Sequence, residues 1–73
     1  MENSKKIIGR IIKTQRKKKN LTLNELAEKL KVDRQYIWNL ENGKINMTAD
    51  YLDKIIEKIG CTHIDFFNLT DLV

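Results

Sequence analysis

The chain repeats one arrangement along its 73 residues: a short polar residue that can cap a helix, then apolar residues three and four positions apart. Ser4, Thr22, Asp33 and Thr48 are expected to begin helices, and a fifth helix is expected to start near Thr62. The sequence contains no proline, and no stretch of useful length alternates apolar and polar residues as a strand does. The sequence therefore predicts an all-α fold, a compact bundle of five short helices.

Local signals give the expected helix boundaries. Thr22 and Glu25 have the spacing of a capping box, in which each side chain bonds the backbone N–H of the other residue. Asn20, Asn42-Gly43 and Gly60 are expected to end helices. The expected helices cover about residues 4–19, 23–30, 34–41 and 49–59, and a short last helix contains Phe66, Phe67 and Leu69. The expected core residues are Ile8, Ile11, Ile12, Leu26, Ala27, Leu30, Ile37, Leu40, Leu52, Ile55, Ile56 and Ile59.

Size and composition exclude several classes of protein. The chain is 41% hydrophobic and 33% charged, which is typical of one small globular domain, here residues 1–73. No apolar run approaches the roughly 20 residues of a membrane-spanning helix, so we expect a cytoplasmic protein with no membrane partner. Cys61 and His63 are the single cysteine and the single histidine, which gives no disulfide, metal site or catalytic triad. We therefore expect no cofactor and no enzyme activity.

The charges are unevenly distributed. Residues 1–35 hold 11 of the 14 Lys and Arg but 4 of the 10 Asp and Glu, so the second half of the chain is acidic. A basic half indicates a polyanionic partner. The run Lys17–Lys19 could also be a solvated helix end, because cations suit helix C-termini.

The segments 23–30 and 34–41 are expected to form a helix-turn-helix unit of about residues 23–42. Ala27 is the small residue where the two helices cross, and Ile37 and Leu40 pack the second helix down. A plain helical hairpin is the alternative. Gln35, Trp38 and Asn39 lie opposite that packed side, with Arg34 beside them.

The stretch LTLNELAEKLKVDRQYIWNLENGK resembles the phage Cro/repressor-type (Xre) helix-turn-helix family. The resemblance extends from Ile8-Gly9 to Gly60. The segments Asp33-Arg34-x-Tyr36-Ile37, Asn46-Met47-Thr48 and Phe66-Phe67 further resemble controller proteins of restriction–modification systems. Two positions depart from the family pattern: Leu23 replaces a frequent glutamine that helps to hold a phosphate, and Lys31 replaces the usual turn glycine.

The resemblance implies a sequence-specific regulator of transcription, of bacterial or mobile-element origin, that binds double-stranded DNA. Arg34, Gln35 and Asn39 would read bases. Arg16 and Glu41 would form an internal ion pair. The residues expected to contact the DNA backbone or groove are Leu23 and Asn24 (through backbone N–H groups), Trp38, Asn42, Lys44, Asn46, Lys17 and Lys31. For Trp38, packing against neighbouring protein or a dimer partner is the alternative.

The family commonly binds palindromic sites as homodimers, and about residues 60–73 are the expected dimerisation region. Its apolar candidates for the interface are Ile64, Phe66, Phe67, Leu69 and Leu72, with one phenylalanine in the core and the other at the interface. The alternative is that all of them close the core. RNA polymerase is a further candidate partner. The rival function is an antitoxin-like protein-interaction module in which DNA binding is secondary.

Overall fold

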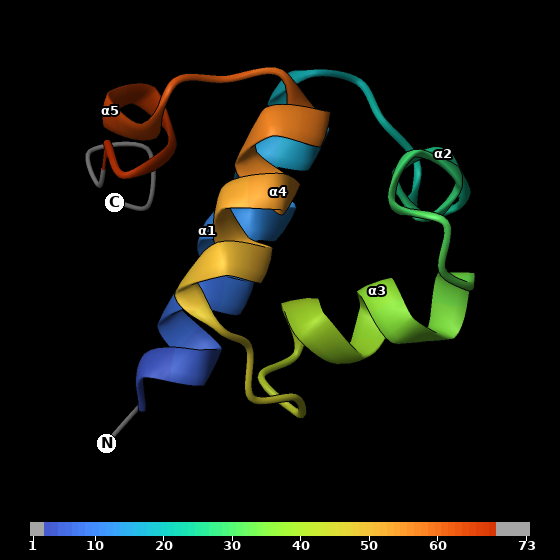
Figure 1. The fold of residues 1–73 in the computed structure, drawn as a ribbon, viewed down its shortest axis with the longest axis horizontal. Coiled ribbons are helices and arrows are strands. Elements are labelled where there is room, and N and C mark those ends of the chain that lie inside the picture. Colours follow the sequence, from blue (N-terminus) through green and yellow to red (C-terminus); the bar gives the residue numbers. More distant parts are fainter. Residues whose placement is uncertain (1–2, 69–73) are drawn as a thin grey trace.

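The part of the chain that the structure describes contains five helices. The computed structural model describes residues 3–68, and its helices are α1 (Ser4–Lys18), α2 (Leu23–Leu30), α3 (Arg34–Glu41), α4 (Ala49–Ile59) and α5 (His63–Phe66). The helices α1 and α4 pack together, with α2 and α3 on one side of them and α5 on the other (Figure 1). Residues 3–68 contain no strand. The predicted all-α fold is confirmed.

Side-chain caps begin four of these helices at the predicted residues. Each cap accepts a hydrogen bond from a backbone N–H three residues later: Thr22 from Glu25, Asp33 from Tyr36, Thr48 from Tyr51, and Thr62 from Asp65. In the predicted capping box, the Thr22 N–H also donates to the Glu25 carboxylate over 2.8 Å. Hydrogen bonds from the backbone and side chain of Thr22 lower the pKa of the Glu25 carboxyl group because they stabilise its charged form.

Two helix ends differ from the prediction. The side chain of Asn3, rather than Ser4, caps α1 and accepts from the Lys6 N–H at 3.1 Å. Both residue types are good caps, so the sequence alone does not separate adjacent candidates. The last helix ends at Phe66, which leaves Phe67 at its C-cap. Leu69, expected in this helix, lies outside the described residues.

One apolar core joins all five helices. Its buried members are Ile11, Ile12, Leu26, Ala27, Leu30, Ile37, Leu40, Ile55, Ile56, Ile59 and Phe66. Ile8 and Leu52, both predicted to be buried, are only partly buried at the edge of this core. Phe66 is fully buried whereas Phe67 exposes 43% of its surface. Phe66 was an interface candidate, but its side chain fills the core and is not available to a partner.

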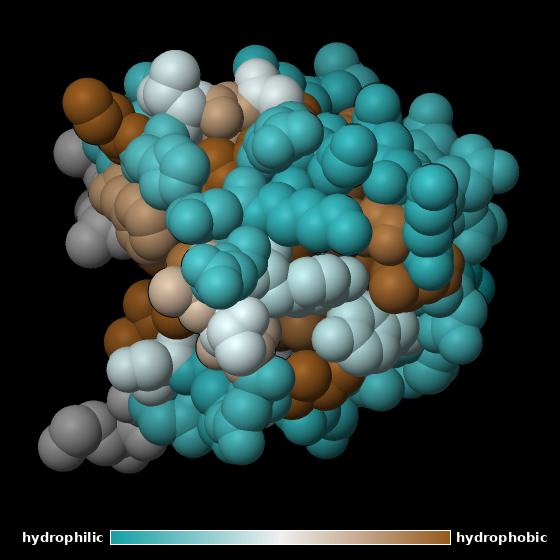
Figure 2. Space-filling view, in the orientation of Figure 1, coloured by the Kyte–Doolittle hydropathy of each residue, from teal (hydrophilic) through white to brown (hydrophobic). Residues whose placement is uncertain are grey.

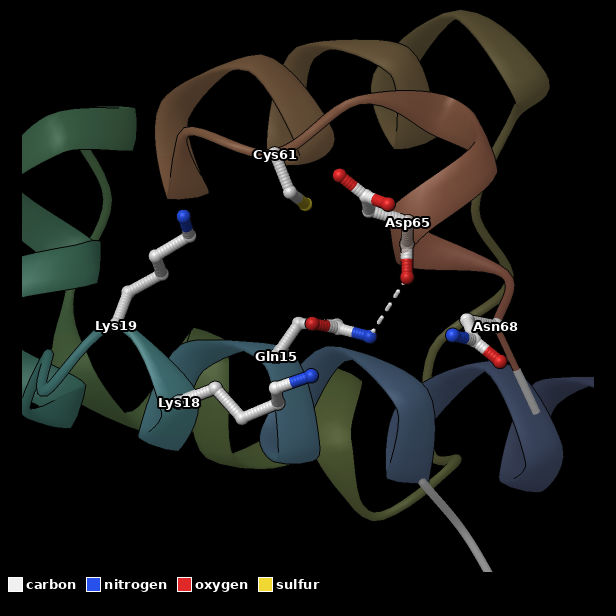
Figure 3. A pocket seen from close by; sticks show the side chains of 6 residues that line it. All are labelled: Gln15, Lys18, Lys19, Cys61, Asp65 and Asn68. Atoms are coloured by element: carbon white, nitrogen blue, oxygen red, sulfur yellow. Dashed lines mark hydrogen bonds between the residues drawn. The ribbon is translucent and has the colours of Figure 1, made fainter. Parts of the chain in front are cut away.

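Gln15 connects the first helix to the last. Its amide nitrogen donates to the backbone carbonyls of Asp65, at 3.0 Å, and Phe66, at 3.2 Å. These carbonyls are at the C-terminal end of α5, where a helix has no internal donors for them. Figure 3 shows the Gln15 amide directed toward Asp65, with Cys61 facing it across a small pocket. Gln15 therefore holds α5 against α1.

The single cysteine lies just before α5, and the single histidine is the first residue of this helix. Cys61 is half-buried, and this burial raises the pKa of its thiol. His63 is exposed, and its Nε2 lies 2.8 Å from an Asp53 carboxylate oxygen on α4. None of the helices described here is long and apolar enough to span a membrane.

Hydrophobic surface gathers over α5. In Figure 2 the region over α5, at the left, includes brown surface, while the region over α2, at the right, is mostly teal. Ile64 exposes 85% of its surface and Phe67 exposes 43%. The main exposed apolar side chains of residues 60–68 therefore lie on the opposite side of α1 and α4 from α2 and α3.

Candidate nucleic-acid interface

The position of α3 is fixed from its buried side. Ile37 is fully buried and Leu40 is 1% exposed, so this side of the helix faces the core. At its start, an Asp33 side-chain oxygen accepts from the Tyr36 N–H at 2.8 Å. The next two residues, Arg34 and Gln35, begin the helix and are both exposed. The first turn of α3 therefore presents polar side chains outward from a fixed backbone.

An internal ion pair holds the other end of α3. Arg16 on α1 donates from Nε to a Glu41 carboxylate oxygen at 2.6 Å and from Nη2 to the second oxygen at 3.1 Å. Its remaining nitrogen, Nη1, donates to the backbone oxygen of Leu21 at 2.7 Å. Both charged residues are only 6% exposed. The expected pair is present, and its bidentate geometry sets the orientation of α3 against α1.

The backbones of α1 and α3 also approach closely. A Cβ atom built at Gly9 would lie 2.5 Å from the Glu41 carbonyl oxygen and 2.6 Å from that of Leu40. No larger residue fits there without moving one of the helices. Gly9 thus permits the approach that brings Arg16 to Glu41.

The turn between α2 and α3 contains a lysine in the left-handed conformation. Lys31 has φ 59° and ψ 43° at the C-cap of α2. The N–H of Lys31 donates to the Glu28 carbonyl, and the N–H of Val32 donates to the Ala27 carbonyl. These bonds close α2 and start the turn, although a residue with a Cβ pays about 1 kcal/mol for this conformation.

Three side chains of α3 line one shallow hollow on the surface: Arg34, Gln35 and Trp38. Trp38 exposes 42% of its surface there. Asn39 lies beside them and accepts a hydrogen bond from the Gln35 side-chain nitrogen at 3.1 Å. The four residues that we expected opposite the core are therefore neighbours on one face.

The loop after α3 adds a charge and an amide to this face. The Lys44 ammonium group lies 6.0 Å from the centre of the Trp38 ring, in cation–π range. The Asn42 side chain donates to the Trp38 carbonyl at 2.8 Å. Asn46 is exposed too, but it lines a different hollow, between the start of α1 and the loop before α4.

The start of α2 has two backbone donors that its capping box does not use. The box occupies the N–H groups of Thr22 and Glu25, which leaves those of Leu23 and Asn24 as the donors of the first turn for an external acceptor. The Leu23 side chain packs against the core, while Asn24 is exposed. Lys17 and Lys31, the other candidates for phosphate contact, are exposed as well.

Among the polar contacts that the sequence did not predict, two show what kind of signal was missing. The Gln35–Asn39 bond joins residues four positions apart, a spacing at which glutamine and asparagine side chains meet on a helix, so the spacing could have predicted it. The bonds from Gln15 to α5 span 50 and 51 residues of sequence and carry no local signal.

This arrangement, two short helices joined by a tight turn with an exposed polar face on the second, defines a helix-turn-helix unit. A family model described as helix-turn-helix matches residues 12–67. The chain belongs to this family, whose Cro/repressor-type (Xre) members are DNA-binding regulators of transcription.

Named relatives agree with this class. The chain is 28% identical over 67 residues to an uncharacterised HTH-type transcriptional regulator, y4dJ, of Sinorhizobium fredii, a match covering 92% of this chain and 87% of that protein. It is 35% identical over 65 residues to a protein of Methanococcus vannielii named as an HTH-type transcriptional regulatory protein. That match covers 89% of this chain but 20% of the Methanococcus protein, so the chain spans about a fifth of its length.

A solved structure has the same fold. The crystal structure of the clp gene regulator ClgR from C. glutamicum superposes with a TM-score of 0.84 and 26% sequence identity, over 96% of this chain and 87% of that one.

Proposed function

We propose that this protein binds double-stranded DNA as a homodimer, with α3 of each copy in the major groove of one half of a palindromic site. The exposed face of α3 carries the proposal. Its Arg34, Gln35 and Asn39 are polar side chains on a helix whose other side is buried and whose end is held by an ion pair. A helix in the major groove presents such residues to base edges.

The side chains of this face suit base recognition. The Arg34 guanidinium can donate to O6 and N7 of guanine, and an amide side chain can pair with N6 and N7 of adenine. Each good pair of this kind contributes about 1–3 kcal/mol of discrimination against the wrong base. Trp38, in this proposal, packs against the sugar–phosphate backbone or a thymine methyl group.

Contacts with phosphates lie on both sides of the reading face. The N–H groups of Leu23 and Asn24 provide an anion-binding helix start on one side, and Asn42, Lys44 and Asn46 contact the backbone on the other. Lys17 and Lys31 make further phosphate contacts. Because Lys44 neutralises a phosphate, Lys44→Ala should make the fall of log affinity with log salt less steep, by about 1 unit of slope.

The dimer forms through α5. The support for this proposal is the exposed apolar surface of Ile64 and Phe67, on the side of the molecule opposite α2 and α3. Leu69 and Leu72, the other interface candidates, lie outside the described residues. An interface there leaves both reading faces clear of the partner.

Selection of bound sites from random DNA duplexes tests the proposal. The expected result is one enriched palindrome whose half-site centres are about 10 base pairs apart. Arg34→Ala serves as the control: it should remove the preference at one position per half-site while the variant stays folded. The proposal fails if no sequence is enriched; if a separate protein then co-purifies tightly, the interaction-module function replaces it.

A further inference from the structure

Gln35 and Asn39 form one hydrogen-bonded unit on the exposed face of α3. The Gln35 side-chain nitrogen donates to the Asn39 side-chain oxygen at 3.1 Å, one helical turn further on. Gln35 is exposed, whereas Asn39 is half-buried. Both amides are candidates for reading bases, but their exposure and the direction of the bond between them make them different.

The bond decides which groups each amide can offer to DNA. Gln35 uses one N–H on Asn39 and keeps its second N–H and its oxygen. A donor beside an acceptor is what adenine requires, since its major-groove edge has the N7 acceptor beside the N6 amino donor. Asn39 already accepts from Gln35 through its oxygen, so turning its amide to pair with both groups of an adenine would disturb this bond.

The positions of Gln35 and Asn39 along α3 agree with different roles for the two side chains. Gln35 is the second residue of α3 and lines the surface hollow together with Arg34 and Trp38. Asn39 does not line that hollow and lies a turn farther from the helix start. The N-terminal residues of a recognition helix are the ones that reach base edges.

We propose that Gln35 reads an adenine in each half-site and that Asn39 is a positioning residue, which holds the Gln35 amide in the reading orientation through its side-chain oxygen. The proposal rests on the proposed DNA-binding function. It predicts that the two residues act at one base pair and that removing Asn39 changes no second position of the site.

The test compares site selection by the wild-type chain and by Gln35→Ala, Asn39→Ala and the double variant. Gln35→Ala should remove an adenine preference of roughly 5- to 150-fold at one position. Asn39→Ala should weaken the preference at that same position and leave the others unchanged. Since the Asn39 effect passes through Gln35, the double variant should discriminate as Gln35→Ala does.

Base analogues and a conservative variant sharpen the test. Replacing that adenine by 7-deazaadenine, which lacks N7, should weaken wild-type binding and leave Gln35→Ala unaffected; the same analogue at an adenine elsewhere in the site is the control. Asn39→Asp keeps an acceptor for Gln35 but has no N–H group. It should lower affinity for all duplexes, because its charge lies near phosphates, yet retain the adenine preference.

The outcomes distinguish a failure of this proposal from a failure of the proposed DNA-binding function. A preference lost at a second position in Asn39→Ala would make Asn39 a reader and overturn the proposal, as would a guanine at the position that Gln35 controls. Loss of the adenine preference in Asn39→Asp would overturn it too. A wild-type chain that selects no sequence would instead remove the DNA-reading function itself. Circular dichroism and thermal melting check that each variant is folded.

Discussion

Trp38 exposes an indole ring beside the Lys44 ammonium group, on the same face as the polar residues of α3. In the proposed complex this ring leaves water and meets the DNA backbone or a thymine methyl group. We expect the emission of this single tryptophan to change when the selected duplex is added. Fluorescence titration measures it, with a scrambled duplex as the control, and an unchanged spectrum at saturating specific DNA would contradict the contact.

Glu41 shows how much one buried charge can matter. Glu41→Ala would leave the Arg16 guanidinium buried without its carboxylate, which should cost about 3–5 kcal/mol of folding free energy. Thermal or urea denaturation measures the loss. Glu57→Ala, at an exposed glutamate on α4, is the matched control and should change stability by less than about 0.5 kcal/mol. Similar melting curves for the two variants would show that the buried pair does not stabilise the fold.

At the scale of the helices, the ends of α1 and α2 provide a matched pair of strained positions. Lys31 has φ 59° and Asn20 has φ 58°, both in the left-handed region. Asparagine tolerates this region better than lysine does, and glycine tolerates it best. Lys31→Gly should therefore stabilise the protein by about 1 kcal/mol, and Asn20→Gly by less. Urea denaturation of both variants measures the two changes in the free energy of unfolding. A larger stabilisation from Asn20→Gly than from Lys31→Gly would contradict the strain at Lys31.

The helices were predictable from the sequence where short-range contacts decide them. Thr22, Asp33 and Thr48 each cap a backbone N–H three residues away, so the signal lies within one turn. The end of α5 was not predictable in this way, because Gln15 holds it from the other end of the chain. The sequence also left open which phenylalanine enters the core, since Phe66 and Phe67 are adjacent at the end of a short helix and equally apolar.

In the candidate site, too, the features set by one helix were predictable and the features set by the folding of a loop were not. Periodicity alone put Arg34, Gln35, Trp38 and Asn39 on the side of α3 away from the core, because one helix determines its own faces. The grouping of Lys44 with Trp38 depends on how the following loop folds back. The separation of Asn46 from that group depends on the same loop.

At the scale of the whole molecule, the two adjacent phenylalanines separate folding from assembly. Phe67→Ser should leave the monomer folded and weaken the proposed dimer, because it removes exposed apolar area. Phe66→Ala should cost about 3–5 kcal/mol of folding free energy, because it opens a cavity in the core. Sedimentation measures the oligomeric state and circular dichroism the fold. A Phe67→Ser chain that remains dimeric would place the interface elsewhere.

The close packing of α1 on α3 at Gly9 has a consequence for how members of this fold can diverge. The Gly9 contact, the Arg16–Glu41 pair and the buried side chains of Ile37 and Leu40 hold α3 against the rest of the fold through its protected side. The outward residues of α3 take no part in holding it in place. The rest of the fold therefore positions α3 independently of the residues that would contact bases. Transplanting residues 34, 35 and 39 between relatives should transfer the preference for an operator sequence without changes elsewhere in the chain.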